Sequence, residues 1–264
     1  MPWNSPSAPP DGPQAYSHDE RMRRADDIAA RFSRHYGDRL LASALYGSLA
    51  RGSDGPFSDI EMMIVIQGSG IDETYEWSSG PWKAEVNIYS EDRLLEWAAE
   101  FDEFWPITHG AIINAVPMLD TIDLFPRARA AVMNHSDEEF RTLIAALLVG
   151  DLYEDVGKIR NGLVLRRMEI IAPFTVDAAR YGACLVGLHN RRVYNNGATL
   201  FSESLKLPGS PDGYDALARL VMSGELNDAT LVCGAVNAFW SGVEAWASAQ
   251  NISLTHNLED LLEE

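Results

Sequence analysis

The chain has 264 residues, of which 46% are apolar and 23% charged, and its formal net charge at pH 7 is −18. This length allows one large or two ordinary domains with a core that needs no disulfide or metal to hold it. The two cysteines lie far apart in apolar surroundings, which argues against a disulfide framework or a zinc site. The acidic balance argues against a nucleic-acid partner, which would need clustered Lys and Arg; it suits a cationic ligand or serves solubility alone.

Residues 1–16 are predicted to form a disordered lead-in, because they begin with a segment rich in Pro, Ser and Gly. This segment has no apolar core of the kind found in signal peptides. No apolar run along the chain reaches the roughly 18 to 20 residues that span a bilayer. We therefore expect a cytoplasmic protein with no membrane partner.

The N-terminal half alternates helical and strand patterns. Ser17 and Glu20 form a capping box that begins a helix to about Tyr36, and Gly37 ends it. Apolar strands are predicted at 40–46, 60–66 and 82–89, and a further strand at 111–118. In the third strand, Ala84, Val86 and Ile88 alternate with Lys83, Glu85 and Asn87, so the two sets face opposite sides.

From Ser136 onward the pattern is helical. A second capping box, Ser136 to Glu139, begins a long helix to about Ile159, and two apolar helices follow at 173–190 and 228–250. The sequence thus predicts an α+β protein: residues 17–132 form a domain with a small mixed sheet flanked by helices, and 133–264 form a helical bundle domain.

Two short motifs carry candidate chemistry. Gly47 and Ser48 end the first strand, where free backbone N–H groups and a hydroxyl could donate to a phosphate. Asp59 and Glu61 flank Ile60 at the start of the second strand, so both carboxylates share one face. Two carboxylates this close repel each other and are well suited to hold a cation such as Mg²⁺. Taken singly, either motif could be an ordinary turn or an acidic strand edge.

The joint pattern, with ten residues between the Gly-Ser turn and the Asp-x-Glu pair, resembles the polymerase-β-type nucleotidyltransferase superfamily. Glu85, on the polar face of the third strand, is the candidate for its third carboxylate. The resemblance implies that the Gly-Ser turn holds a triphosphate and that the carboxylates hold Mg²⁺. An acceptor hydroxyl would then attack the α-phosphorus and pyrophosphate would leave.

Residues 46–49 and 54–63 narrow the resemblance to the kanamycin nucleotidyltransferase family of aminoglycoside 4′-O-nucleotidyltransferases. Together the similar segments extend from about residue 19 to about residue 246. The other segments that resemble this family are 76–77, 82–87, 105–110, 157–161, 187–189 and 211–215.

The family resemblance implies a homodimer with active sites at the subunit interface. ATP or another NTP would donate the nucleotide to the 4′-hydroxyl of an aminoglycoside such as kanamycin, tobramycin or amikacin, giving antibiotic resistance. The family's site residues fall on the Mg²⁺ ligands Asp59 and Glu61, the nucleotide contacts Gly47, Ser48, Arg51, Ser58 and Lys158, the aminoglycoside contacts Glu76, Lys83 and Glu85, and the general base Glu154.

Glu154 and Lys158 are four residues apart on a predicted helix and so share a face. A carboxylate can accept the proton of an attacking sugar hydroxyl, and a neighbouring cation would keep it ionised. Read without the family, the same pair is also what an ordinary solvated salt bridge looks like.

Two positions depart from the family pattern. Gly150 stands where the family has an acidic residue that binds the aminoglycoside, and its neighbour Asp151 is the candidate replacement. Phe104 stands at a second acidic position, with Asp102 and Glu103 beside it. These departures leave open the range of aminoglycosides and the use of a 4″-hydroxyl. An acidic cleft that includes Asp151 would still complement a polycationic acceptor.

Two other interpretations remain. The same chemistry could serve a different hydroxyl acceptor, such as another sugar or a protein side chain. Alternatively, the chain could be a non-catalytic nucleotide-binding module, because fold does not by itself determine function.

Overall fold

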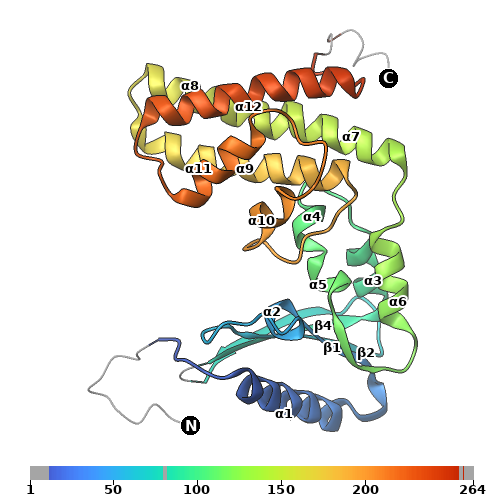
Figure 1. The fold of residues 1–264 in the computed structure, drawn as a ribbon. Helices are drawn as coiled ribbons and strands as arrows, with labels where there is room; N and C mark the ends of the chain where they lie inside the picture. The colour runs from blue at the N-terminus through green and yellow to red at the C-terminus, as the bar shows by residue number, and fades with distance from the viewer. Residues whose placement is uncertain (1–11, 80–81, 256–257, 259–264) are drawn as a thin grey trace. The chain divides into compact units, whose positions relative to one another are not determined.

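The computed structural model of the protein describes residues 12–79, 82–255 and 258. Most of the lead-in predicted at 1–16 lies outside this range. The chain divides into two compact units (Figure 1), which are described separately below. Unit 1 consists of the residues up to 100 together with 109–134, and unit 2 of residues 101–108 together with those from 135 onward.

Unit 1 contains a five-stranded sheet in the order β3-β4-β2-β1-β5 within the described residues. The β2 and β4 strands are parallel, and the other neighbouring pairs are antiparallel, so the sheet is mixed as predicted. The strands are β1 Leu40–Tyr46, β2 Ile60–Ile66, β3 Asp72–Ser78, β4 Lys83–Ser90 and β5 Val116–Asp120.

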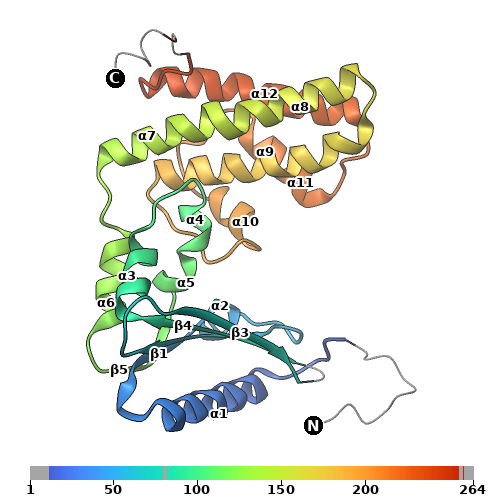
Figure 2. The same ribbon diagram turned by 180° about the vertical axis from the view of Figure 1, so that it is seen from behind.

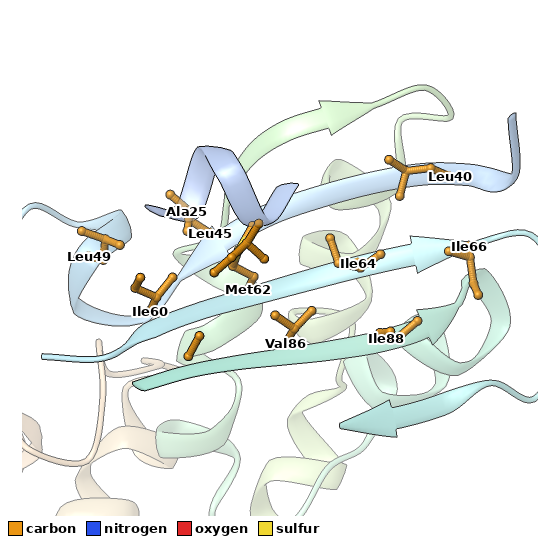
Figure 3. Close-up of a cluster of buried hydrophobic side chains, with 12 residues drawn as sticks. Ala25, Leu40, Leu45, Leu49, Ile60, Met62, Ile64, Ile66, Val86 and Ile88 are labelled. Atoms are coloured by element: carbon orange, nitrogen blue, oxygen red, sulfur yellow. The ribbon is translucent and has the colours of Figure 1, made fainter. Parts of the chain in front are cut away.

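One face of this sheet is covered by α1, His18–Tyr36 (Figure 1). The predicted capping box at Ser17 is present, and Gly37 caps the other end of the helix at φ 54°. Between helix and sheet lies a buried apolar cluster (Figure 3) that includes Ile60, Met62 and Ile64 of β2. Burial of each such side chain contributes about 1.5–3 kcal/mol to the stability of the fold. The packing against α1 therefore holds in place the strands that carry the candidate site.

On the other side of the sheet, α3 contacts β2 and β4, and α6 contacts β5. The predicted strand at 111–118 is wrong in its first half, since a helical turn precedes β5 there. The β3 strand was not predicted because its residues are polar and exposed apart from Trp77, so they give no apolar alternation. The helices of unit 1 not yet given are α2 Gly47–Ala50, α3 Glu91–Ala99, α5 Gly110–Ile113 and α6 Leu124–Val132.

Unit 2 is helical, as predicted. The longest helix described in it, α9, contacts α7, α8, α11 and α12. Figures 1 and 2 show α7 and α8 lying end to end, with α9 and α12 running alongside them. The helices are α4 Trp105–Thr108, α7 Asp137–Leu147, α8 Tyr153–Val164, α9 Met168–His189, α10 Leu200–Ser204, α11 Tyr214–Ser223 and α12 Ala229–Ala249.

Three features of unit 2 refine the sequence prediction. The long helix from Ser136 is interrupted by a π-helical turn, Leu148–Leu152, and α9 begins at Met168, ahead of Pro173. The segment 101–108, which the predicted boundary assigned to the first domain, groups with unit 2. It does so because Trp105 is fully buried and packs edge-on against Phe140 of α7, with ring centroids 5.4 Å apart. None of the helices in the described part of the chain is both long and apolar enough to cross a membrane.

Candidate active site

A row of polar side chains crosses four strands of the sheet in unit 1. Tyr46 on β1 is paired with Glu61 on β2, Glu61 with Glu85 on β4, and Glu85 with Glu76 on β3. Paired residues on neighbouring strands project from the same face of a sheet. Three of the carboxylates predicted from sequence are therefore brought together by strand register.

Gly47 lies directly against the central carboxylate of this row. Its φ is +69°, and a Cβ atom built on it would lie 1.6 Å from Oε2 of Glu61. Any larger residue would displace the carboxylate, and the positive φ would be strained as well. The glycine is thus needed both for the turn into α2, where Ser48 follows it, and for the close approach of Glu61 to the backbone.

Lys83 places an ammonium group among the carboxylates. Its Nζ lies 3.1 Å from Oε1 of Glu76, and 3.8 Å from both Oδ2 of Asp59 and Oε2 of Glu85. The hydrogen bond to Glu76 raises the pKa of Lys83 above its ordinary value. One charged cluster is therefore formed by three carboxylates around the ammonium group of Lys83, those of Asp59, Glu76 and Glu85.

The two central carboxylates have different electrostatic environments. Burial raises the pKa of Glu61 to about 7, and the negative charges of Asp59 and Glu85 act in the same direction, partly offset by Arg51. Burial also acts to raise the pKa of Glu85, but hydrogen bonds from Asn87 and Tyr46 outweigh it and hold that pKa below its ordinary value. Glu85 is thus held in its charged form. The charged form of Glu61 is disfavoured by its surroundings, and a neighbouring cation would stabilise it.

Sequence reasoning gave no role to the two residues that fix Glu85. The Tyr46 hydroxyl donates to Oε1 of Glu85 at 2.9 Å, and Nδ2 of Asn87 donates to the same oxygen at 2.9 Å and to the Tyr46 oxygen at 2.7 Å. Burial raises the pKa of Tyr46, so its hydroxyl stays protonated and able to donate. The available signal was weak: Asn87 follows Glu85 at the period of two that puts both on one face.

The loop between α2 and β2 carries Ser58 and Asp59. The N–H of Ser58 donates to the Gly55 carbonyl at 3.2 Å, and the Gly55 N–H donates to Oγ of Ser58 at 3.0 Å. Because Ser58 accepts this bond, its own hydroxyl proton can be donated elsewhere. Ser58 can therefore supply a donor to a phosphate next to the carboxylates.

The pair Asp59 and Glu61 suits Mg²⁺, which commonly takes one or two protein carboxylates and completes its shell with phosphate oxygens and water. Within the described residues, no group of three or more His, Cys, Asp or Glu side chains is arranged to hold a metal by itself. The pair by itself would leave most positions of an octahedral shell open to phosphate oxygens or water.

The predicted base lies in unit 2, near the start of α8. Oε1 of Glu154 is 2.9 Å from Nζ of Lys158, and the Glu154 side chain is 66% exposed. Lys158 also lies 3.4 Å from Oδ1 of the buried Asp155 and 4.5 Å from the centre of the Phe174 ring. The predicted pair is therefore formed, and Asp155 is a further charged neighbour that the sequence had not singled out.

Phe104 and Asp151, two residues discussed in the sequence analysis, both lie near Tyr181. The Phe104 and Tyr181 rings lie 5.9 Å apart. Burial raises the pKa of Tyr181 to about 12, and the charges of Asp151 and Glu103 contribute. Two carboxylates, those of Asp151 and Glu103, therefore lie near the Tyr181 ring that packs on Phe104.

The Gly-Ser turn, the Asp-x-Glu pair and a third carboxylate thus lie together on a mixed sheet, as the resemblance to the nucleotidyltransferase class implies. Residues 122–253 match the model of the KNTase C-terminal domain. Two curated relatives, from Bacillus sp and Staphylococcus aureus, are each named aminoglycoside nucleotidyltransferase (4′). Each is 37% identical to this chain over 235 residues, which cover 89% of the chain and 93% of the relative.

The chain therefore belongs to the aminoglycoside nucleotidyltransferase (4′) family. Among solved structures, a nucleotidyltransferase-like protein from Exiguobacterium sibiricum is similar with a TM-score of 0.47 and 11% identity, covering 89% of this chain and 76% of that one.

Proposed function

We propose that this protein is an enzyme that transfers a nucleoside monophosphate from Mg²⁺-bound ATP, or another NTP, to the 4′-hydroxyl of aminoglycosides such as kanamycin, tobramycin and amikacin, and so gives resistance to them. The observation that carries the proposal is the row of carboxylates across the sheet, with Glu61 lying against Gly47. Family membership supports the choice of acceptor.

In this proposal Asp59 and Glu61 hold Mg²⁺, which would neutralise charge that develops around the α-phosphorus. Donors at Ser48 and Ser58, with the Arg51 guanidinium, bind and orient the phosphates. Holding the phosphates in one pose lowers the entropic part of the barrier.

Glu154 accepts the proton of the attacking hydroxyl. It is exposed, and its Oε1 lies 2.9 Å from Nζ of Lys158; a carboxylate in this place can take up a proton as the hydroxyl attacks. Lys158 also offers a cation to the phosphates. In this proposal α8 supplies both the carboxylate that acts as base and the positive charge beside it.

The aminoglycoside, a polycation, would be bound by acidic side chains. Glu76, Glu85 and Asp151 are the proposed contacts, with Asp151 in place of the acidic residue that the family resemblance implies at position 150. Charge complementarity of this kind raises both specificity and the rate of encounter. We also infer a homodimer with active sites at the subunit interface; its support is the family resemblance.

The direct test is pyrophosphate release from Mg·ATP by the purified protein, with and without tobramycin. Release that requires both magnesium and tobramycin is expected, and the mass and NMR spectra of the product should place one nucleotide on the 4′-oxygen. A matched reaction without magnesium controls for background hydrolysis.

Absence of release with tobramycin, kanamycin and amikacin would contradict the proposal. Binding of a nucleotide without turnover would then favour a non-catalytic module, whereas turnover with another hydroxyl compound would favour a different acceptor.

A further inference from the structure

A buried ion pair lies at the start of α1, outside the row of carboxylates. The Arg21 and Asp54 side chains are 2% and 1% exposed, and Nη2 of Arg21 lies 2.7 Å from Oδ2 of Asp54, with its Nε donating to the same oxygen at 2.8 Å. Removing two charges from water is costly unless they are paired and hydrogen-bonded. Burial would raise the pKa of Asp54, but hydrogen bonds from His18 and Arg21 hold it below its ordinary value.

The geometry of this pair follows from where α1 begins. The capping box at Ser17 fixes the first turn, which puts His18 and Arg21 three residues apart on one side of the helix. Nδ1 of His18 lies 2.7 Å from Oδ1 of Asp54, so both oxygens of that carboxylate have a partner on α1.

The same helix end also holds the backbone of the loop. The carbonyl oxygen of Pro56 accepts hydrogen bonds from Nη1 of Arg21 at 3.0 Å and from the Tyr16 N–H at 2.8 Å. Asp54 and Pro56 thus tie the loop to α1 by a side chain and a main-chain group. Two residues beyond Pro56 come Ser58 and then Asp59, the proposed phosphate contact and metal ligand.

We propose that Arg21 is a positioning residue for nucleotide and metal binding. By anchoring Asp54 and Pro56, it fixes the turn from Gly55 to Ser58 and so the place from which Asp59 projects. This inference rests on the proposed function. A planar guanidinium that bonds to a carboxylate and a carbonyl at once sets both the distance and the direction of the loop, which a lysine cannot do.

The pair also has a reason to be charged. Apolar side chains of similar volume in such a place are often as stabilising as a buried ion pair, or more so. They would not, however, impose the directional contacts that Arg21 makes with the side chain of Asp54 and the carbonyl of Pro56. Holding a loop in one conformation is what these contacts add.

The test compares Arg21→Lys with the wild-type protein by two measurements that do not depend on turnover. The first is amide hydrogen exchange of peptides that cover residues 51–60. The second is binding of Mn²⁺ alone, followed by electron paramagnetic resonance. The matched control is Arg31→Lys, which alters an exposed ion pair with Asp27 on the same helix.

Arg21→Lys should speed exchange in 51–60 and weaken Mn²⁺ binding about 10- to 100-fold, the range for loss of a group that orients a ligand. Arg31→Lys should change neither. Asp54→Asn removes the carboxylate that Arg21 binds; it should have the same two effects, and it provides the test if Arg21→Lys does not fold.

Unchanged exchange and Mn²⁺ affinity in a folded Arg21→Lys or Asp54→Asn variant that is only less heat-stable would overturn the proposal and leave a structural role. If the wild-type protein itself releases no pyrophosphate, the proposed function fails, but these two measurements still decide whether Arg21 positions the loop.

Discussion

Glu61 and Glu154 are both acidic residues proposed to act in catalysis, yet the chain positions them by different means. Glu61 lies inside a sheet, where strand register brings its neighbours from two other strands, β1 and β4. Glu154 lies on α8, and its cationic neighbour is four residues further along the same helix. The first arrangement depends on pairing between distant segments of the chain, and the second on the spacing of four residues within one helix.

This difference has an energetic consequence. The partly buried Glu61 carries an electrostatic cost, visible as a pKa raised to about 7 by burial and by the neighbouring carboxylates. The exposed pair of Glu154 and Lys158 is of a kind worth about 0.3–0.5 kcal/mol. Changes in the sheet cluster should therefore alter both stability and activity, whereas changes on α8 should alter activity alone.

The largest effect is expected from Asp59→Asn. Loss of one proposed metal ligand should lower kcat/KM on the order of 10³-fold, because metal stabilisation of the transition state is worth several kcal/mol. Steady-state pyrophosphate release measures it, with circular dichroism to verify folding. Asp27→Asn, on the exposed part of α1, is the control. Turnover near the wild-type level in Asp59→Asn would remove the metal-ligand assignment.

Glu154→Gln should lower kcat by about 10²- to 10⁴-fold, since that is the range for loss of a general base. Binding of tobramycin, measured by calorimetry, should change little, and the midpoint of thermal unfolding should stay close to that of the wild type. Glu169→Gln, at the exposed start of α9, is a matched control. If only KM changes, Glu154 binds substrate and is not the base.

Gly47→Ala should lower activity by about 10- to 100-fold, because the added methyl group forces Glu61 out of place. Gly52 offers a matched control: its φ is +64°, but a Cβ there would meet no atom within 4 Å. Both substitutions carry a backbone cost of about 1–2 kcal/mol, so thermal unfolding should register both. Equal activity in the two variants would show that contact with Glu61 does not matter.

Local patterns predicted much of this molecule. Both capping boxes, the three apolar strands and the helical half follow from periodicity and from residues that cap helices. The Gly-Ser turn and the Asp-x-Glu pair could be recognised because they lie within one stretch of sequence. The alternation of β4 correctly separated the face of Glu85 from the face of Val86.

What sequence reasoning missed depends on pairing between distant segments. The β3 strand is polar and is defined by its partner β4, so no pattern of its own revealed it. The contacts of Tyr46 with Glu85, and of Arg21 with Asp54, join residues 39 and 33 positions apart. Strand order and helix packing create such contacts, and a single sequence does not state them.

The smallest effect, and the one that tests the sheet cluster most directly, is a pH dependence of stability. The pKa of Glu61 is about 7 in the folded protein and 4.5 in its ordinary state. Between these values the folded state binds a proton that the unfolded state has lost, so metal-free stability should fall as pH rises through this window. Mg²⁺ bound to the ionised carboxylate should reverse the trend, so that the rise in Tm caused by Mg²⁺ is larger near about pH 8 than near about pH 5.

Glu61→Gln should remove most of this pH dependence, whereas Glu225→Gln, on an exposed loop after α11, should keep it. A Tm increment from Mg²⁺ that is the same at both pH values would mean that Glu61 does not bind the metal, and that the sheet cluster serves the cationic acceptor alone.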